Sequence, residues 1–127
     1  YFKATKTKLN SLKNIDFVYG TSEEKLEEII QKIENKNLCF WLDGHFSDGD
    51  TFLGENWTPV LYELEIIEKY LSKFDNVNIL IDDIRLFNPN STEGEYYPDK
   101  NEIVDWCKKN NLSWEIHSDI FIAKKET

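Results

Sequence analysis

The sequence has no methionine among its 127 residues, only two cysteines, and fewer basic than acidic side chains. A translated chain begins with methionine, so the start at Tyr1 indicates that processing removed the beginning or that the sequence is a fragment. Lys and Arg number 15 against 24 Asp and Glu, which gives a net charge of −9. Because an acidic surface repels phosphate backbones, nucleic acid is not expected as a partner, whereas divalent cations remain compatible.

Long apolar runs and export signals are also missing. No run approaches the roughly 20 residues that a membrane span needs, so no membrane partner is expected. Cys39 and Cys107 lie within apolar patterns and lack the spacing of a metal-binding pair. We therefore expect two reduced thiols in the core of a cytoplasmic protein. The length suits one domain, residues 1–127, and neither a Walker loop nor a G-x-S-x-G motif is present.

The chain alternates short apolar runs with amphipathic stretches. Apolar runs bounded by Gly, Asn or Asp are typical of strands, which we predict at 15–19, 38–42, 77–81, 114–117 and 120–123. Apolar residues at helical spacing behind Thr or Asp caps predict helices at 21–33, 58–74 and 99–109. In the second helix the predicted buried stripe comprises Val60, Leu64, Ile67, Leu71 and Phe74. Glu63, Glu65 and Glu68 are expected mainly outside that stripe.

This order of elements predicts an α/β fold. Strands that alternate with helices imply a mostly parallel sheet covered on both faces, as in a Rossmann-like three-layer α/β/α arrangement. The last two strands flank Ser118-Asp119 and are expected to form a C-terminal antiparallel hairpin.

Acidic residues follow two of the predicted strands at the point where each ends. Asp43 follows the strand at 38–42, and Asp82 and Asp83 follow the strand at 77–81. Acids beyond neighbouring parallel strands can converge, and clustered carboxylates need a proton or a cation. Oxygen ligands with open positions suit Mg²⁺ or Mn²⁺. Alternatively, the aspartates only cap turns and following helices, because Asp is common there.

Two basic side chains lie close to these acids in the sequence. His45, two residues after Asp43, could act as a general base or a metal ligand, or could be a solvated loop side chain. Arg85 could bind an anionic group or pair with one of the carboxylates of Asp82 and Asp83.

Several motifs together resemble a known family. These are FWLDGH at 40–45, TP before a Glu-rich helix, ILIDDIR at 79–85, and YP before a terminal hairpin with a single Asp. In these motifs the chain resembles the class I S-adenosylmethionine-dependent O-methyltransferases related to macrocin O-methyltransferase. The resemblance spans nearly the whole chain but only the C-terminal part of the family's domain.

The resemblance implies a role for each matching residue. Asp43, after the family's fourth strand, and Asp82 with Asp83, after its fifth, would hold a divalent cation such as Mg²⁺. His45 occupies the position at which the family has a carboxylate proposed as the base, so in this chain the base would be an imidazole. Gly20, Thr21 and Ser22 occupy the place that lines the adenine pocket of S-adenosylmethionine. The implied reaction is methyl transfer to a hydroxyl of a small-molecule or glycan acceptor.

The chain departs from the family in one respect. The glycine-rich loop after the first strand and the ribose-binding acid after the second are absent and would lie upstream of Tyr1. In the family's strand order, 3-2-1-4-5-7-6, the missing strands lie between the strand at 15–19 and the strand at 38–42. Either upstream chain is missing and the domain is truncated at its N-terminus, or the strand at 15–19 packs directly against the strand at 38–42. In both cases these residues are expected to bind the cosubstrate poorly by themselves.

Two other functions fit acids at strand ends. A metal-dependent phosphoryl-handling domain, such as a receiver or hydrolase, also groups acids there, although receivers carry their Asp pair after the first strand and a lysine after a later one. A non-catalytic binding module would keep the fold without the chemistry.

Overall fold

The computed structural model describes residues 18, 22–43, 59–88 and 97–126. Except for Val18, the predicted strand at 15–19 lies outside these residues, as do the predicted caps Thr21 and Thr58. The described elements are, in chain order, α2 (Ser22–Lys32), β1 (Asn37–Leu42), α3 (Val60–Tyr70), η1 (Leu71–Lys73), β2 (Asn76–Ile81), η2 (Ile84–Leu86), α4 (Lys100–Lys109), β3 (Ser113–His117) and β4 (Ile120–Lys125). These elements confirm the predicted helices and strands within the described part of the chain.

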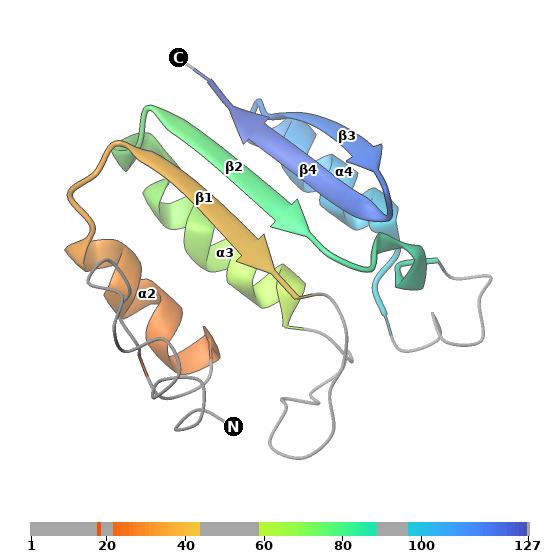
Figure 1. The fold of residues 1–127 in the computed structure, drawn as a ribbon, viewed down its shortest axis with the longest axis horizontal. Coiled ribbons are helices and arrows are strands. Elements are labelled where there is room, and N and C mark those ends of the chain that lie inside the picture. Colours follow the sequence, from red (N-terminus) through yellow and green to blue (C-terminus); the bar gives the residue numbers. More distant parts are fainter. Residues whose placement is uncertain (1–17, 19–21, 44–58, 89–96, 127) are drawn as a thin grey trace.

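The strands form one mixed sheet with the order β1-β2-β4-β3 (Figure 1). β1 and β2 are parallel, with Leu42 paired with Ile81. β4 lies antiparallel to both β2 and β3, and β3 and β4 form the predicted hairpin. Ser118 and Asp119 have positive φ values of 51° and 63°, as a two-residue hairpin turn with the twist of its strands requires. The fold is therefore an α/β fold with an open four-stranded sheet.

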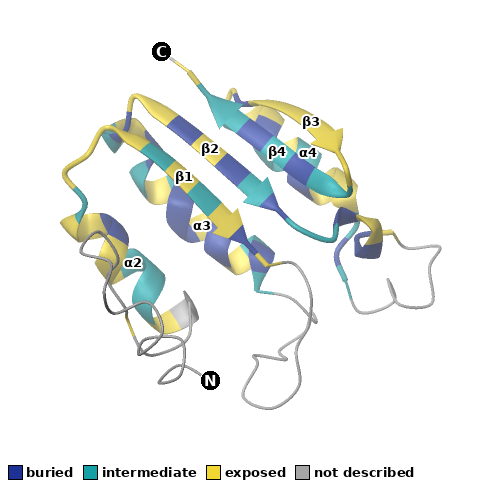
Figure 2. Cartoon of the chain, viewed as in Figure 1, coloured by how far each residue is buried: buried dark blue, intermediate teal, exposed yellow. Residues whose placement is uncertain are grey.

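The helices cover one face of this sheet. α3 and α4 lie behind the sheet in Figure 1, and α2 packs beside α3. The side chains that point to this face are buried in alternation along β2 and β4 (Figure 2), namely Val77, Ile79, Ile81, Phe121 and Ala123. The predicted stripe of α3 and η1, from Val60 to Phe74, is buried against them as expected. Apolar residues at period 2 on strands and at helical period on helices thus build one core.

The opposite face of the sheet carries no helix in the described part of the chain. Cys39, Trp41 and Asn78 are exposed on it, and Trp41 retains 57% of its accessible surface. The expectation of helices on both faces is therefore not confirmed. The expectation of two core thiols is wrong for Cys39, because odd-numbered residues of β1 point to this uncovered face. It is confirmed for Cys107 of α4, where burial raises the pKa of the thiol to about 11.

Long-range contacts hold the ends of the helices. Lys73 Nζ donates hydrogen bonds to Ile30 O and Gln31 O in the last turn of α2. Lys125 Nζ of β4 lies 2.6 Å from both Leu71 O and Phe74 O, at the carboxyl end of η1. Carbonyls at helix ends lack intrahelical partners and carry negative partial charge, so an ammonium group stabilises them. At the start of α4, the carboxylate of Asp99 accepts the amide of Asn101, which confirms the predicted cap.

Candidate functional site

The carboxyl ends of the two parallel strands lie side by side. The amide of Asp82 donates to Leu42 O over 3.0 Å, so β1 and β2 end at the same level. Asp43 then follows β1 and is exposed, whereas Asp82 follows β2 and is half-buried. Because neighbouring parallel strands lie about 4.8 Å apart, the first acids beyond these two strands sit at one edge of the sheet. Ligands of open α/β sheets commonly bind at this edge.

Asp83 turns away from the line of the strand. Its backbone lies in the left-handed region with φ 57° and ψ 42°, which Asp adopts more readily than most residues. Asp82 Oδ1 accepts the amide of Asp83 over 2.9 Å, so the carboxylate of Asp82 holds this turn. The turn leads directly into η2. The two adjacent aspartates therefore have different surroundings.

The carboxylate of Asp83 pairs with Arg85 and, through it, with the tip of the hairpin. Arg85 Nη1 donates to Asp83 Oδ1 over 2.8 Å and also to Asp119 Oδ2. These hydrogen bonds, first that to Asp83 and then that to Asp119, raise the pKa of the guanidinium. Of the two alternatives for Arg85, pairing with the carboxylates is thus the arrangement observed.

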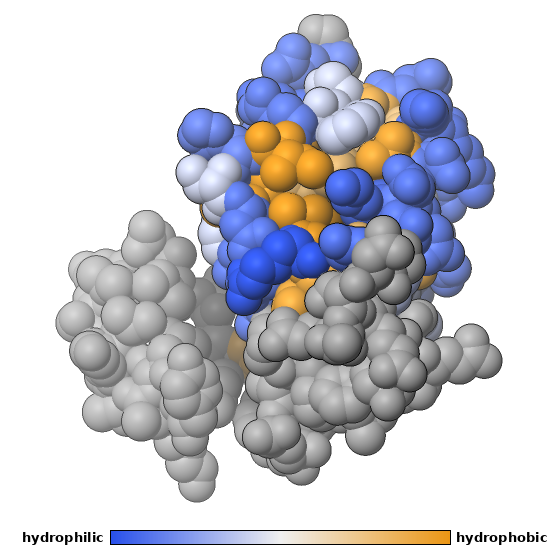
Figure 3. All heavy atoms as spheres, turned by 90° about the vertical axis from the view of Figure 1, so that its right-hand side faces the viewer, coloured by the Kyte–Doolittle hydropathy of each residue, from blue (hydrophilic) through white to orange (hydrophobic). Residues whose placement is uncertain are grey.

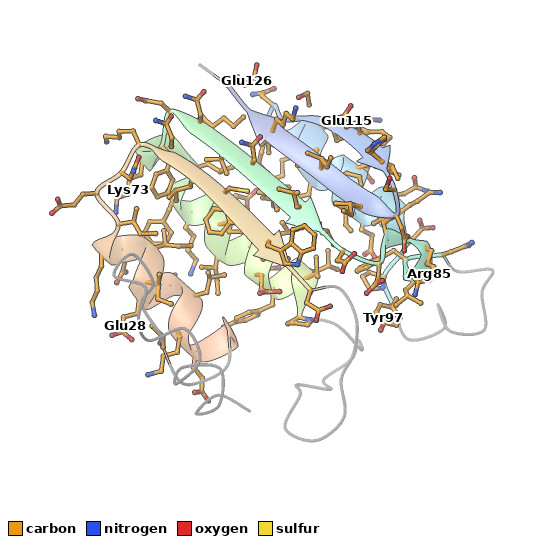
Figure 4. All side chains as sticks on the ribbon, in the orientation of Figure 1. Glu28, Lys73, Arg85, Tyr97, Glu115 and Glu126 are labelled. Carbon is orange, nitrogen blue, oxygen red and sulfur yellow. The ribbon has the colours of Figure 1, made fainter. Side chains whose placement is uncertain are left out.

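Asp119 fixes η2 through its backbone as well as its side chain. Its carbonyl oxygen accepts the amide of Ile84 over 3.1 Å, and its Oδ1 accepts the amide of Arg85 over 2.9 Å. These are contacts between residues 34 or more positions apart, which no local periodicity can reveal. The only feature of the sequence that points to these contacts is the single Asp in the terminal hairpin. Figure 4 shows Arg85 and Tyr97 at the same end of the molecule, beyond the carboxyl ends of the parallel strands.

Glu63, near the start of α3, is an acidic residue whose burial differs from the sequence prediction. Glu63 was expected outside the buried stripe, but only 6% of it is exposed. It belongs to the first turn of α3, where the helix dipole favours a carboxylate. The stripe of α3 is wider than predicted, since Ile66 is also buried; the helix contacts α2 and shares one core with the strands.

The predicted site residues also include His45, Gly20, Thr21 and Ser22. His45, Gly20 and Thr21 lie outside the described residues, and Ser22 is the first residue of α2, whose side chain is not described. Within the described residues, no group of three or more His, Cys, Asp or Glu side chains is close enough to hold a metal ion. The structure therefore brings Asp43 and Asp82 to one edge and engages Asp83 with Arg85, while the metal role of all three stays a prediction.

A shallow depression lies on a different part of the sheet. It has a volume of about 180 Å³ and is lined by Ser113, Trp114, Glu115, Ile122 and Lys124. Pockets for small molecules usually enclose about 300 Å³ or more, and none of the predicted site residues lines this one. The depression is therefore distinct from the edge with Asp43 and Asp82.

Comparisons with protein-family models, with curated proteins and with solved structures found no match to this chain. None of the described helices has the length and apolar character required to cross a membrane.

Proposed function

We propose that this chain forms the metal- and acceptor-binding part of an S-adenosylmethionine-dependent O-methyltransferase. The observation that carries the proposal is the strand order β1-β2-β4-β3 with β4 antiparallel. If β1 and β2 correspond to the family's fourth and fifth strands and the hairpin to its sixth and seventh, this order equals the 4-5-7-6 part of the family's sheet. The last strand, β4, inserts between β2 and β3 and is antiparallel to both, which agrees with the resemblance that the motifs indicate.

The same correspondence extends the fold to a Rossmann-like three-layer arrangement. β1 is an outer strand of the described sheet, and the face with Cys39 and Trp41 has no described helix over it. An exposed Trp on a sheet face favours burial by a further layer. We assign the outer edge of β1 to the family's first strand and this face to its second helix layer.

The donor atoms at the strand ends fit a hard divalent cation. Mg²⁺ is commonly held by one or two carboxylates and several waters, and Asp43 and Asp82 supply two carboxylates at adjacent strand ends. When bound there, the cation would lower the pKa of an acceptor hydroxyl and orient it. Coordination positions that two carboxylates leave to water on such a cation would suit a small-molecule or glycan acceptor with neighbouring hydroxyls.

The other predicted residues have more restricted roles in this proposal. Arg85 binds Oδ1 of Asp83, so Asp83 would ligate the cation through Oδ2, with Asp43 and Asp82 as the other two proposed ligands. His45 is proposed as the base that takes the acceptor proton, and Gly20, Thr21 and Ser22 as part of the adenine pocket of the cosubstrate. Without the glycine-rich loop, these 127 residues are expected to bind S-adenosylmethionine poorly.

The experiment that tests the proposal is titration of the chain with Mn²⁺, followed through paramagnetic broadening of its amide resonances. Broadening should centre on Asp43 and Asp82 and should disappear in Asp82→Asn. Asp75→Asn is the matched control, because Asp75 is an exposed aspartate at the opposite end of β2. Catechol, a probe with two neighbouring hydroxyls, should bind in the presence of Mn²⁺ to wild type but not to Asp82→Asn.

The alternatives give different results in the same samples. Mg²⁺-dependent phosphorylation by acetyl phosphate, detected as an increase in intact mass, would favour a phosphoryl-handling domain. If Asp82→Asn and Asp83→Asn leave the response to metal unchanged, the chain is a non-catalytic binding module. Tight binding of S-adenosylmethionine in calorimetry would contradict the assignment of these residues to the acceptor half alone.

A further inference from the structure

β3 is an outer strand of the described sheet and presents its free edge to solvent. All five of its residues are exposed, and they include two large apolar side chains. Trp114 retains 43% and Ile116 44% of their accessible surface. Figure 3 faces this edge and shows apolar surface framed by hydrophilic residues. A strand edge of this kind is a template for pairing with another strand, and natural proteins usually protect it with charge, proline or a bulge.

The hairpin register identifies the backbone groups that remain unpaired within the described sheet. In a two-residue hairpin the residues beside the turn form a hydrogen-bonded pair, which here is His117 with Ile120. Such pairs alternate along an antiparallel ladder, so Trp114 and Ile116 occupy the positions that do not bond to β4. Their amides and carbonyls therefore point along the sheet toward the free edge.

We propose that β3 pairs antiparallel with β3 of a second copy of this chain, about a two-fold axis that passes through Ile116. The two copies of Ile116 then exchange both backbone hydrogen bonds, and their side chains meet on the helix-covered side of the sheet. Each Trp114 lies diagonal to Ile116 of the second copy, within reach of an aromatic side chain. The result is a continuous sheet across two copies.

Complementary side chains select this register and this occupant. With Ile116 on the axis, Glu115 of each copy faces His117 of the other in a closely spaced pair, so a carboxylate meets an imidazole that can donate an N–H to it, twice. With Glu115 on the axis, two carboxylates would face each other, which is unfavourable. The strand is thus complementary to itself, as a two-fold interface requires.

The net charge of each chain limits the strength of the association. Two copies with a charge of −9 each repel one another at low ionic strength, and salt screens this repulsion. We expect a weak dimer that forms at high protein concentration and becomes more populated as salt is added.

Sedimentation velocity over a range of protein concentrations tests the proposal. Wild type should shift from monomer to dimer, and Ile116→Pro should remain monomeric, because Pro lacks the amide that points to the free edge and is tolerated on edge strands. Glu115→Lys should also weaken the dimer, whereas Glu65→Lys, which makes the same change of charge on the exposed surface of α3, should not. The double variant that exchanges the two side chains, Glu115→His with His117→Glu, should restore the dimer.

An intermolecular Hα–Hα nuclear Overhauser effect between Glu115 and His117, in a sample that mixes labelled and unlabelled chains, should establish the register. Circular dichroism of each variant should match wild type, so that loss of the dimer is not loss of the fold. A wild-type chain that stays monomeric at submillimolar concentration and moderate salt would overturn the proposal. An intermolecular contact between Glu115 and Ser113 in place of His117 would overturn it too, since it would place Trp114 on the axis.

Discussion

Asp83 combines an unusual backbone conformation with a salt bridge. A residue with a Cβ in the left-handed region costs about 1–2 kcal/mol relative to Gly, and Asp reduces this cost through local hydrogen bonds. Here the amide of Asp83 bonds to the side chain of Asp82, and its carboxylate pairs with Arg85. The effect of the left-handed backbone can be separated from that of the pairing with Arg85 by comparing two substitutions that both remove the carboxylate.

We expect Asp83→Ala to be less stable than Asp83→Gly by about 1 kcal/mol. Both variants lose the pairing with Arg85, so the difference between them reports only the left-handed backbone at φ 57°. Urea unfolding of the two variants measures it. Equal unfolding midpoints would show that the turn does not constrain this residue.

Cys39 and Cys107 should differ in reactivity because only one of them is buried. Burial raises the pKa of Cys107 to about 11, so its thiol stays protonated at mildly alkaline pH, and the thiolate is the reactive form. Iodoacetamide should modify Cys39 in the folded chain and Cys107 only after unfolding, as read by peptide mass. In Cys39→Ser, rapid modification of the native chain would contradict the burial of Cys107.

The ends of α2 and η1 depend on lysines from other elements. Lys125 of β4 reaches Leu71 O and Phe74 O, and both carbonyls lie at the end of the α3–η1 segment. We expect Lys125→Met to lower the free energy of unfolding by about 1–2 kcal/mol, since two charge-assisted hydrogen bonds are lost while the apolar stem is kept. Lys124→Met, on the other face of β4, is the matched control and should change stability by less than about 0.5 kcal/mol.

α3 and α4 are joined by a polar contact that depends on pH. Asn110 Nδ2 donates to Glu68 Oε1 over 2.8 Å, and this hydrogen bond is the largest cause of the lowered pKa of Glu68, with Lys109 adding to it. A folded pKa below the unfolded value of 4.5 means that this contribution is present above pH 4.5 and is lost as pH falls through the folded pKa.

The loss of stability on acidification should therefore be smaller in Glu68→Gln than in wild type. The Glu68 side chain retains 29% of its accessible surface and its partner Lys109 retains 71%, so solvent screens part of the interaction and the effect is expected to be modest. Chemical unfolding at neutral pH and below pH 4.5 compares the two proteins. Glu65→Gln, on the exposed side of α3, serves as the control; an equal change there would assign the effect to net charge instead.

The chain has a large net negative charge for its size, so its stability should depend on salt concentration. Repulsion among like charges opposes the compact state, and salt near physiological strength shortens the Debye length to about 8 Å. We expect the unfolding midpoint to rise with sodium chloride. The double variant Glu65→Gln with Asp75→Asn changes the net charge from −9 to −7, so its unfolding midpoint should rise less with salt than that of wild type. Parallel salt curves for the two proteins would exclude net charge as the cause.

Short-range patterns determined most of the elements. Apolar residues at helical spacing between Val60 and Phe74 specified α3 and η1, and the cap at Asp99 specified the start of α4. The two apolar runs around Ser118-Asp119 specified the hairpin. Each of these signals lies within one element, where periodicity and capping act directly on the backbone. The placement of acids just beyond β1 and β2 followed from the same signals.

Tertiary structure alone decided which face of each element is covered. The pattern of β1 does not distinguish Cys39 from a core residue, because a strand has two faces and only the helices that pack on it choose between them. The burial of Glu63 likewise depends on α3 packing against two neighbours. The pairing of Asp83 with Arg85 is local, but its extension to Asp119 depends on β4 inserting beside β2. Contacts between residues far apart in sequence arise only when the sheet assembles, so the sequence determined the elements and their acids, and the assembled sheet determined the surroundings of each acid.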